Sequence, residues 1–113
     1  METKIFKANE IHLLANIAKE GSIIAFPTET VFGLGVVYDN EEAFNNLVKV
    51  KERKTDKPFT LMVGYTRDIE NYAVLNTKTK NLIDVFMPGE ITLIIEAKLN
   101  LPKHVTLGSK YIG

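Results

Sequence analysis

Apolar and polar residues alternate along the chain in short blocks that predict helices and strands in turn. Over about residues 10–20 the apolar positions recur with helical spacing and gather on one broad face, formed by Ile11, Leu13, Leu14, Ala15, Ile17 and Ala18. Asn9 is placed to cap the start of this helix and Gly21 to end it. The apolar block 22–26 that follows predicts a short buried strand.

The same reasoning predicts the elements further along the chain. They are a helix over about 41–53 capped by Asn40, a strand over 59–63, helices over about 67–73 and 78–86 capped by Thr66 and Thr77, and a strand over 91–97. A loop around Pro102 should follow, and residues 109–113 look like the start of another strand. Helices alternating with short strands predict an α/β layer fold. The strand-like ending suggests that the chain is cut short or belongs to a longer protein.

Length and composition narrow the class of protein. The 113 residues suit one domain, and 45% hydrophobic with 25% charged residues is ordinary for a globular chain. No apolar run approaches the roughly 18 residues of a membrane span, and we expect a cytoplasmic protein. The absence of cysteine excludes disulfides and thiolate chemistry. Fourteen basic and fourteen acidic residues cancel, so any site for a polyanion must come from local clustering.

Two motifs follow the first predicted strand. Pro27-Thr28-Glu29-Thr30 places two hydroxyls and a carboxylate at the end of a strand, where α/β proteins often bind small polar ligands. An ordinary polar turn, with hydroxyls satisfying local backbone groups, would have the same residues. The pair Gly33 and Gly35 permits close backbone approach, but Tyr38 stands where a dinucleotide fingerprint needs a third glycine. A bulge or a tight packing contact explains the glycine pair equally well.

A basic run closes the second predicted helix. Residues 49–57 carry five positive and two negative charges, a net of +3; the cations are Lys49, Lys51, Arg53, Lys54 and Lys57. On an ideal helix Lys51 falls inside the apolar arc that includes Phe44 and Leu47. Such a lysine must extend to solvent, pair with a carboxylate or line a polar cleft. With Arg53 and Lys57 it would suit nucleotide phosphates, and the alternative is a solvated helix end.

The other polar motifs carry weaker signals. Pro88-Gly89-Glu90-Ile91-Thr92 is a turn entering a strand, with a hydroxyl at its second strand position. His12 and His104 have no partners at metal-ligand spacing, so we expect both at the surface and no protein metal site.

Together, PTETVFGLG, KVKERKTDKPF and FMPGEITLII occur in the order and at the spacing of the YrdC-like family, which the chain resembles over almost its whole length. The resemblance implies a twisted mixed sheet with flanking helices and a positively charged cavity. It also implies threonylcarbamoyl-adenylate synthesis from L-threonine, bicarbonate and ATP, with Mg²⁺ and release of pyrophosphate, for modification of tRNA adenosine. The resemblance further implies partner proteins that act in tRNA modification, and it implies no association with a membrane.

The resemblance also assigns roles to individual residues. It implies that Lys51 and Arg53 are catalytic, that Thr30 and Met62 bind L-threonine, and that Arg53, Lys57 and Thr92 bind the nucleotide. Two positions depart from the family pattern: Met87 stands for a large aromatic residue and Glu90 for a proline.

The family continues beyond the position of Gly113 with an arginine-containing segment and an S-x-N motif that complete the nucleotide site. Residues 1–113 would therefore form the N-terminal portion of the usual domain. Two alternatives to the enzyme remain: a non-catalytic module that binds double-stranded RNA or tRNA through residues 49–57, and an incomplete fold that binds nothing.

Overall fold

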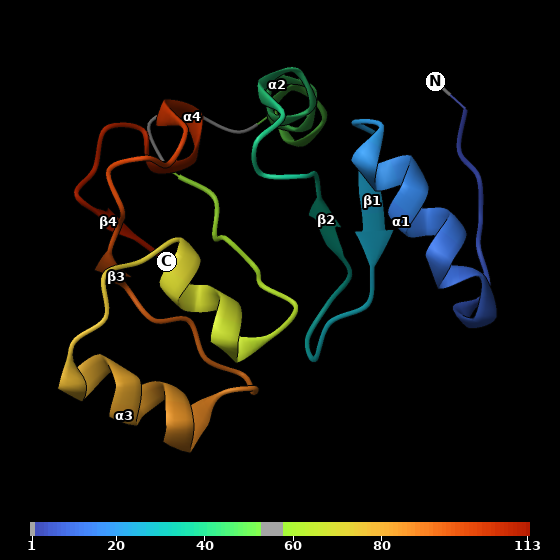
Figure 1. Cartoon of the computed structure of the whole chain (residues 1–113). Helices are drawn as coiled ribbons and strands as arrows, with labels where there is room; N and C mark the ends of the chain where they lie inside the picture. The colour runs from blue at the N-terminus through green and yellow to red at the C-terminus, as the bar shows by residue number, and fades with distance from the viewer. Residues whose placement is uncertain (1, 53–57) are drawn as a thin grey trace. The chain divides into compact units, whose positions relative to one another are not determined.

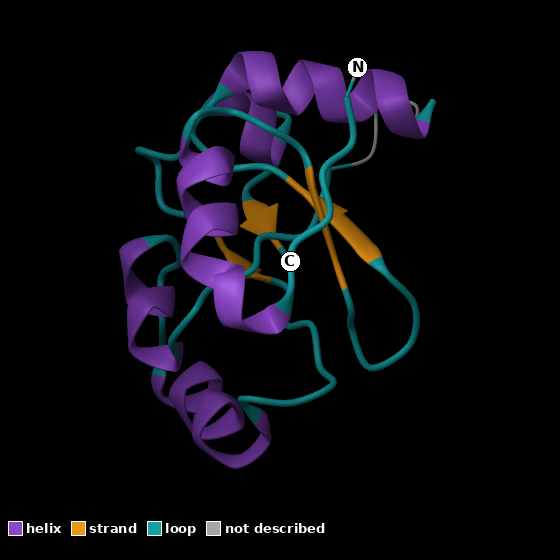
Figure 2. Ribbon diagram, turned by 90° about the vertical axis from the view of Figure 1, so that its right-hand side faces the viewer, coloured by secondary structure: helices purple, strands orange, loops and turns teal. Residues whose placement is uncertain are grey.

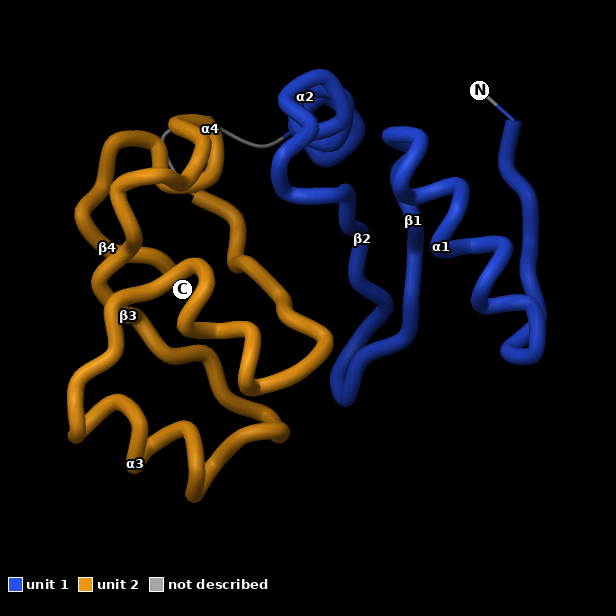
Figure 3. Tube along the Cα trace, in the orientation of Figure 1, with its two compact units in different colours: residues 1–53 blue, residues 54–113 orange. Residues whose placement is uncertain are grey.

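Helices and loops make up most of the chain, and the strands are short (Figures 1 and 2). The computed structural model describes residues 2–52 and 58–113. The chain divides into two compact units, Met1–Arg53 and Lys54–Gly113, which Figure 3 colours separately. Among the described residues no helix is long and apolar enough to cross a membrane.

The first unit begins with a 3₁₀ turn, η1 (Ala8–Glu10), that leads directly into helix α1 (Ile11–Lys19). Asn9 lies inside this turn, so the prediction that it caps the helix is wrong. The Glu10 carboxylate instead accepts the backbone N–H of Lys7 at 3.0 Å and starts the turn earlier. Gly21 has a φ of +100°, which confirms its predicted role in ending the helix.

The buried face of α1 is narrower than the predicted one. Ala18 is buried and Leu14 and Ile17 are half-buried, whereas Ile11 is 69% and Leu13 41% exposed. Helical periodicity identifies an apolar arc, but the neighbouring elements decide how much of that arc they cover.

Strands β1 (Ile24–Phe26) and β2 (Gly33–Gly35) form an antiparallel pair in which Phe26 lies opposite Gly33 and Ile24 opposite Gly35. The ring of Phe26 extends over both glycines: a Cβ at Gly33 or at Gly35 would come within 3.1 Å of it. The glycine pair is therefore explained by a tight packing contact, made with the neighbouring strand. A methyl group at either position would have to displace the ring.

Helix α2 (Glu41–Lys51) begins at its predicted cap. The Asn40 side-chain oxygen accepts the backbone N–H of Ala43 at 3.0 Å. A Cβ at Gly21 would lie 2.9 Å from the Asn40 amide nitrogen, so the end of α1 packs closely against the start of α2. The helix buries Ala43 and Leu47 and ends at Lys51, after which Glu52 has a left-handed conformation with a φ of 51°.

The second unit is built around a small apolar core. Its helices are η2 (Thr66–Asn71), a 3₁₀ helix, α3 (Thr77–Phe86) and α4 (Lys103–Thr106). Strands β3 (Ile95–Glu96) and β4 (Tyr111–Ile112) pair antiparallel, with a further bridge between Ala73 and Ala97. Buried Ile69, Ala73 and Ile83 form the core, and five partly buried residues pack on it: Val63, Leu75, Met87, Leu93 and Ile95.

In the second unit, several observed elements differ from the predicted ones. Residues 59–63 are not a strand, although the Leu61 N–H donates to the Gly113 carbonyl at 2.9 Å, and the predicted strand 91–97 shrinks to β3. The predicted loop after Pro102 contains α4. The final strand prediction is confirmed by β4. Within the described ranges the sheets are two-stranded and antiparallel, smaller than the expected twisted mixed sheet.

The helix starts also differ by one residue from the predicted ones. Asn76, and not Thr77, caps α3: its side-chain oxygen accepts both the backbone N–H and the hydroxyl of Thr79 at 2.8 Å. Tyr65 precedes η2 in the position predicted for Thr66, and it makes no side-chain capping bond. An asparagine one residue upstream is a better acceptor for a helix start than the threonine that follows it.

The first prediction concerns the α2 cap. Asn40→Ala should lower the free energy of unfolding by about 1 kcal/mol, because an N–H of the first turn loses its acceptor. Thermal or urea unfolding measures the change. Asn45→Ala removes the same side chain at an exposed position inside α2 and is the matched control, expected to change stability little. Equal effects of the two substitutions would contradict the capping role.

The second prediction concerns Phe26. Gly35→Ala should be more destabilising with Phe26 present than in a Phe26→Leu background, with a coupling energy of about 0.5–1 kcal/mol, because only the ring meets the added methyl group. A double-mutant cycle of unfolding free energies measures it. Gly64→Ala, where an added Cβ meets nothing within 4 Å, is the control. A coupling energy of zero would exclude the proposed contact.

Candidate functional site

The connection between β1 and β2 carries the hydroxyl groups of the first motif. The Thr28 hydroxyl donates to the Val31 carbonyl and accepts the backbone N–H of Thr30 at 3.4 Å. The hydroxyl oxygens of Thr28 and Thr30 are 3.5 Å apart. Thr28 therefore satisfies local backbone groups, as the polar-turn interpretation expects, whereas the Thr30 hydroxyl contacts the Thr28 hydroxyl.

The rest of this connection is open to solvent. Glu29 and Thr30 are exposed, and Val31 and Phe32 are each 73% exposed. A hydroxyl, a carboxylate and two apolar side chains thus stand side by side on one short segment. These groups suit a small ligand that has both polar and apolar parts, such as an amino acid.

Lys51 is the last residue of α2. It follows Leu47 by four residues and Ala43 by eight, so it continues the line of the two buried side chains while being exposed itself. The position on this face agrees with the prediction, and its exposure agrees with a side chain that extends beyond the apolar surface. A cation at this end also complements the helix dipole. The other two predicted phosphate-binding residues, Arg53 and Lys57, lie outside the described residues.

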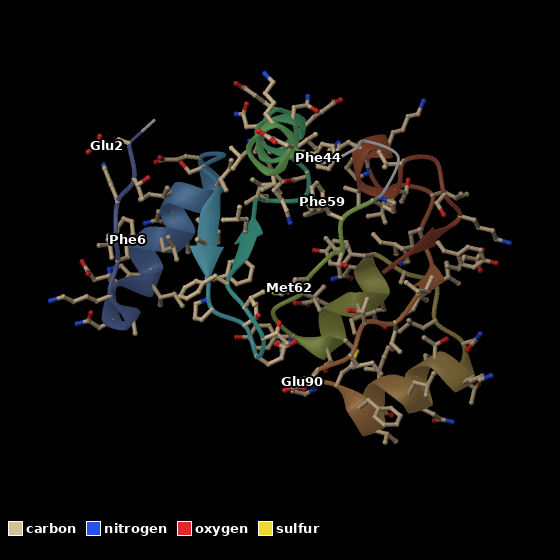
Figure 4. All side chains as sticks on the ribbon, turned by 180° about the vertical axis from the view of Figure 1, so that it is seen from behind. Glu2, Phe6, Phe44, Phe59, Met62 and Glu90 are labelled. Atoms are coloured by element: carbon tan, nitrogen blue, oxygen red, sulfur yellow. The ribbon has the colours of Figure 1, made fainter. Side chains whose placement is uncertain are left out.

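The other two described residues with predicted roles, Met62 and Thr92, belong to the second unit. Met62 lies in the extended segment that leads to η2, where Figure 4 labels it, and is 70% exposed. Thr92 is exposed, and its methyl group is 3.3 Å from the position of a Cβ on Gly113. Both side chains are accessible to a ligand.

The glycine of the Pro-Gly turn before Thr92 is required because a larger residue would collide with the backbone. A Cβ at Gly89 would lie 2.7 Å from the backbone carbonyl oxygen of Phe86, at the end of α3. Only glycine fits this approach without moving the backbone. The motif therefore fixes how the chain leaves α3 on its way to Thr92.

The structure brings together some of the predicted site residues and separates others. Thr28 and Thr30 meet in the β1–β2 connection. Figure 1 shows that connection at one end of the hairpin and α2 beyond the other end, so Thr30 and Lys51 belong to segments that are not adjacent. The convergence of the three cations on one cleft stays a prediction.

The two histidines differ in exposure. His12 is exposed, as expected, and His104 is half-buried, so it is less superficial than the sequence suggested. Across residues 2–52 and 58–113, no three His, Asp or Glu side chains are grouped so that they could hold a metal ion.

A family model and curated relatives of this chain all point to the same family. The Sua5/YciO/YrdC family model, described as "Telomere recombination", matches residues 16–113. Threonylcarbamoyl-AMP synthase of Aliivibrio fischeri is 34% identical over 85% of this chain and 54% of its own length. That of Bacillus subtilis is 34% identical over 92% of this chain and 31% of its own length. The chain thus spans about half the length, or less, of these curated relatives.

Solved structures agree with the sequence matches. The crystal structure of P. abyssi Sua5 complexed with L-threonine superposes with a TM-score of 0.85 and 28% identity over 96% of this chain and 32% of its own. E. coli YciO, with a TM-score of 0.82 and 21% identity, shares the fold. The α/β fold class predicted from the sequence is confirmed by these neighbours. With a family model matching most of its residues, the chain belongs to the Sua5/YciO/YrdC family.

Proposed function

We propose that the full protein makes threonylcarbamoyl-AMP from L-threonine, bicarbonate and ATP, and that residues 1–113 form the N-terminal portion of the catalytic domain. The observation that carries the proposal is the match to a Sua5 structure complexed with L-threonine, over 96% of this chain. The curated relatives named threonylcarbamoyl-AMP synthase support it. The product would serve tRNA modification in the cytoplasm, together with partner proteins of that pathway.

The reaction would proceed in two chemical steps. The amine of threonine adds to the carbon of bicarbonate, and loss of water leaves a carbamate. A carbamate oxygen then attacks the α-phosphorus of ATP, a new P–O bond forms, and the bond to the β-phosphate oxygen breaks to release pyrophosphate. Such chemistry depends on positioning and on neutralising phosphate charge more than on protein acids and bases.

The residues of this chain would divide these tasks. Thr30 orients the amino acid through its hydroxyl, and the apolar side chain of Met62 receives the threonine methyl group. The phosphates are neutralised by Lys51, Arg53 and Lys57, the arginine as a planar fork and the lysines as compact charges. The hydroxyl of Thr92 donates a hydrogen bond to the nucleotide.

Mg²⁺ would arrive with the triphosphate. This ion keeps several water ligands and is commonly held by substrate phosphates together with one or two carboxylates. That mode of binding needs no dedicated protein cage.

The basic run 49–57 supports one alternative, an RNA-binding module. Its five cations could contact a phosphate backbone without any chemistry. Binding of this kind weakens steeply with salt, by about one log unit per log of salt concentration for each phosphate neutralised.

The third prediction tests the role of Arg53. Arg53→Ala in the full-length protein should slow pyrophosphate release by on the order of a hundredfold, because the developing charge on the phosphates loses a preorganised partner. Arg67→Ala is the matched control: Arg67 is exposed and stacks over the Tyr65 ring at 4.4 Å, and its loss should leave the rate unchanged. A near-normal rate for Arg53→Ala would remove the assigned role.

The fourth prediction separates enzyme from RNA binder. Calorimetric titration of the full-length protein should show binding of both ATP and L-threonine. A duplex RNA should bind weakly and lose that binding as salt rises. Tight, salt-sensitive RNA binding with no heat from ATP or L-threonine would favour the RNA-binding module instead.

A further inference from the structure

The hydrogen bonds of the β1–β2 connection converge on one atom, the hydroxyl oxygen of Thr28. That oxygen carries a single proton, which it donates to the Val31 carbonyl. It also accepts the Thr30 backbone N–H at 3.4 Å and lies 3.5 Å from the Thr30 hydroxyl oxygen. Thr28 is half-buried, and its hydroxyl is held by these contacts within the connection itself.

Counting protons fixes the direction of the contact between the two hydroxyls. Because the only Thr28 proton points to the Val31 carbonyl, Thr28 can act toward Thr30 only as an acceptor. The Thr30 hydroxyl must therefore donate to Thr28. At 3.5 Å this contact is weaker than a usual hydroxyl pair, so it biases the Thr30 proton toward Thr28 and leaves the hydroxyl within reach of a ligand.

The consequence is that the exposed Thr30 oxygen presents its lone pairs to the solvent. An oxygen whose proton is biased inward is better placed to accept a hydrogen bond from a ligand than to donate one. An amino acid offers two polar groups, an amine with N–H donors and a carboxylate with acceptors only. The Thr30 oxygen matches the amine and would face the carboxylate unfavourably.

We propose that Thr28 is a positioning residue that orients the Thr30 hydroxyl, so that Thr30 accepts a hydrogen bond from the amine of the amino-acid substrate. The inference rests on the proposed function, and it adds which end of the substrate Thr30 recognises. It also gives the second threonine of the motif a role of its own. Holding an amine N–H would direct the nitrogen lone pair during carbamate formation.

The first arm of the test compares two substitutions in the full-length protein. Thr28→Val keeps the shape but removes the hydroxyl, and it should raise KM for L-threonine about tenfold with KM for ATP unchanged. Thr28→Ser restores the hydroxyl and should restore the lower KM. Thr77→Val, at an exposed threonine at the start of α3, should change neither constant. Failure of serine to rescue would overturn the positioning role.

The second arm identifies the group that Thr30 meets. Inhibition constants against L-threonine would be measured for L-threoninamide, which keeps the amine and lacks the carboxylate, and for 3-hydroxybutanoate, which keeps the carboxylate and lacks the amine. Thr28→Val should raise the inhibition constant of L-threoninamide about tenfold and leave that of 3-hydroxybutanoate unchanged. The reverse pattern would show that Thr30 donates to the carboxylate and would overturn the inference.

The two levels of the proposal fail differently. If the protein is not a threonylcarbamoyl-AMP synthase, the unsubstituted protein will bind neither L-threonine nor its amide, and both proposals fall. If only the role of Thr28 is wrong, L-threonine will bind and react normally, and Thr28→Val will behave like the unsubstituted protein. Thermal unfolding of each variant shows whether a changed KM reflects loss of folded protein.

Discussion

One aromatic ring organises the hairpin whose connection carries Thr28 and Thr30. Phe26 lies across Gly33 and Gly35 of the facing strand, in a space that a side chain at either glycine would close. The ring contributes apolar contact that the two glycines cannot provide, and the glycines leave room for it. The β1–β2 connection, with Thr28 and Thr30, is held between the two paired strands. The packing constraint and the threonine motif therefore both lie within residues 26–35, and the constraint explains the glycines without a phosphate ligand.

In the second unit, too, a glycine permits a close approach and apolar packing holds the chain in place. The close approach at Gly89 sets the direction in which the chain leaves α3, and the core of Ile69, Ala73 and Ile83 anchors the helices on either side. Two-residue strands could not stabilise this unit alone, because a short isolated pair is marginal in water. The core and the Ala73–Ala97 bridge supply the remaining cohesion.

The chemistry proposed for the site agrees with the kinds of side chain that the protein exposes. Hydroxyls, a helix-end lysine and an accessible methionine can orient a substrate and balance its charge, and none of them needs to act as a strong acid or base. In the proposed step a carbamate oxygen attacks the α-phosphorus of ATP. That step depends on correct positioning of the substrates and on neutralisation of the phosphate charge. The residue types are therefore compatible with the proposed reaction.

Local sequence was sufficient wherever a feature depends on neighbours along the chain. Helix geometry and single hydrogen bonds between residues a few positions apart explain three such features. They are Asn40 as a cap, Gly21 as a helix end, and the position of Lys51 on the face of Ala43 and Leu47. The motif order also identified the family, because three spaced motifs rarely agree by chance.

Tertiary structure decided what depends on partners distant in the sequence. Residues 59–63 and 91–97 have the composition of strands, yet strand length depends on which segment offers backbone groups to pair, and composition does not specify that segment. Three further features were likewise settled only in three dimensions: the width of the buried face of α1, the ring above Gly33 and Gly35, and the contact between the Thr28 and Thr30 hydroxyls. Each depends on where an atom of another residue lies, and residue types in order contain no distances.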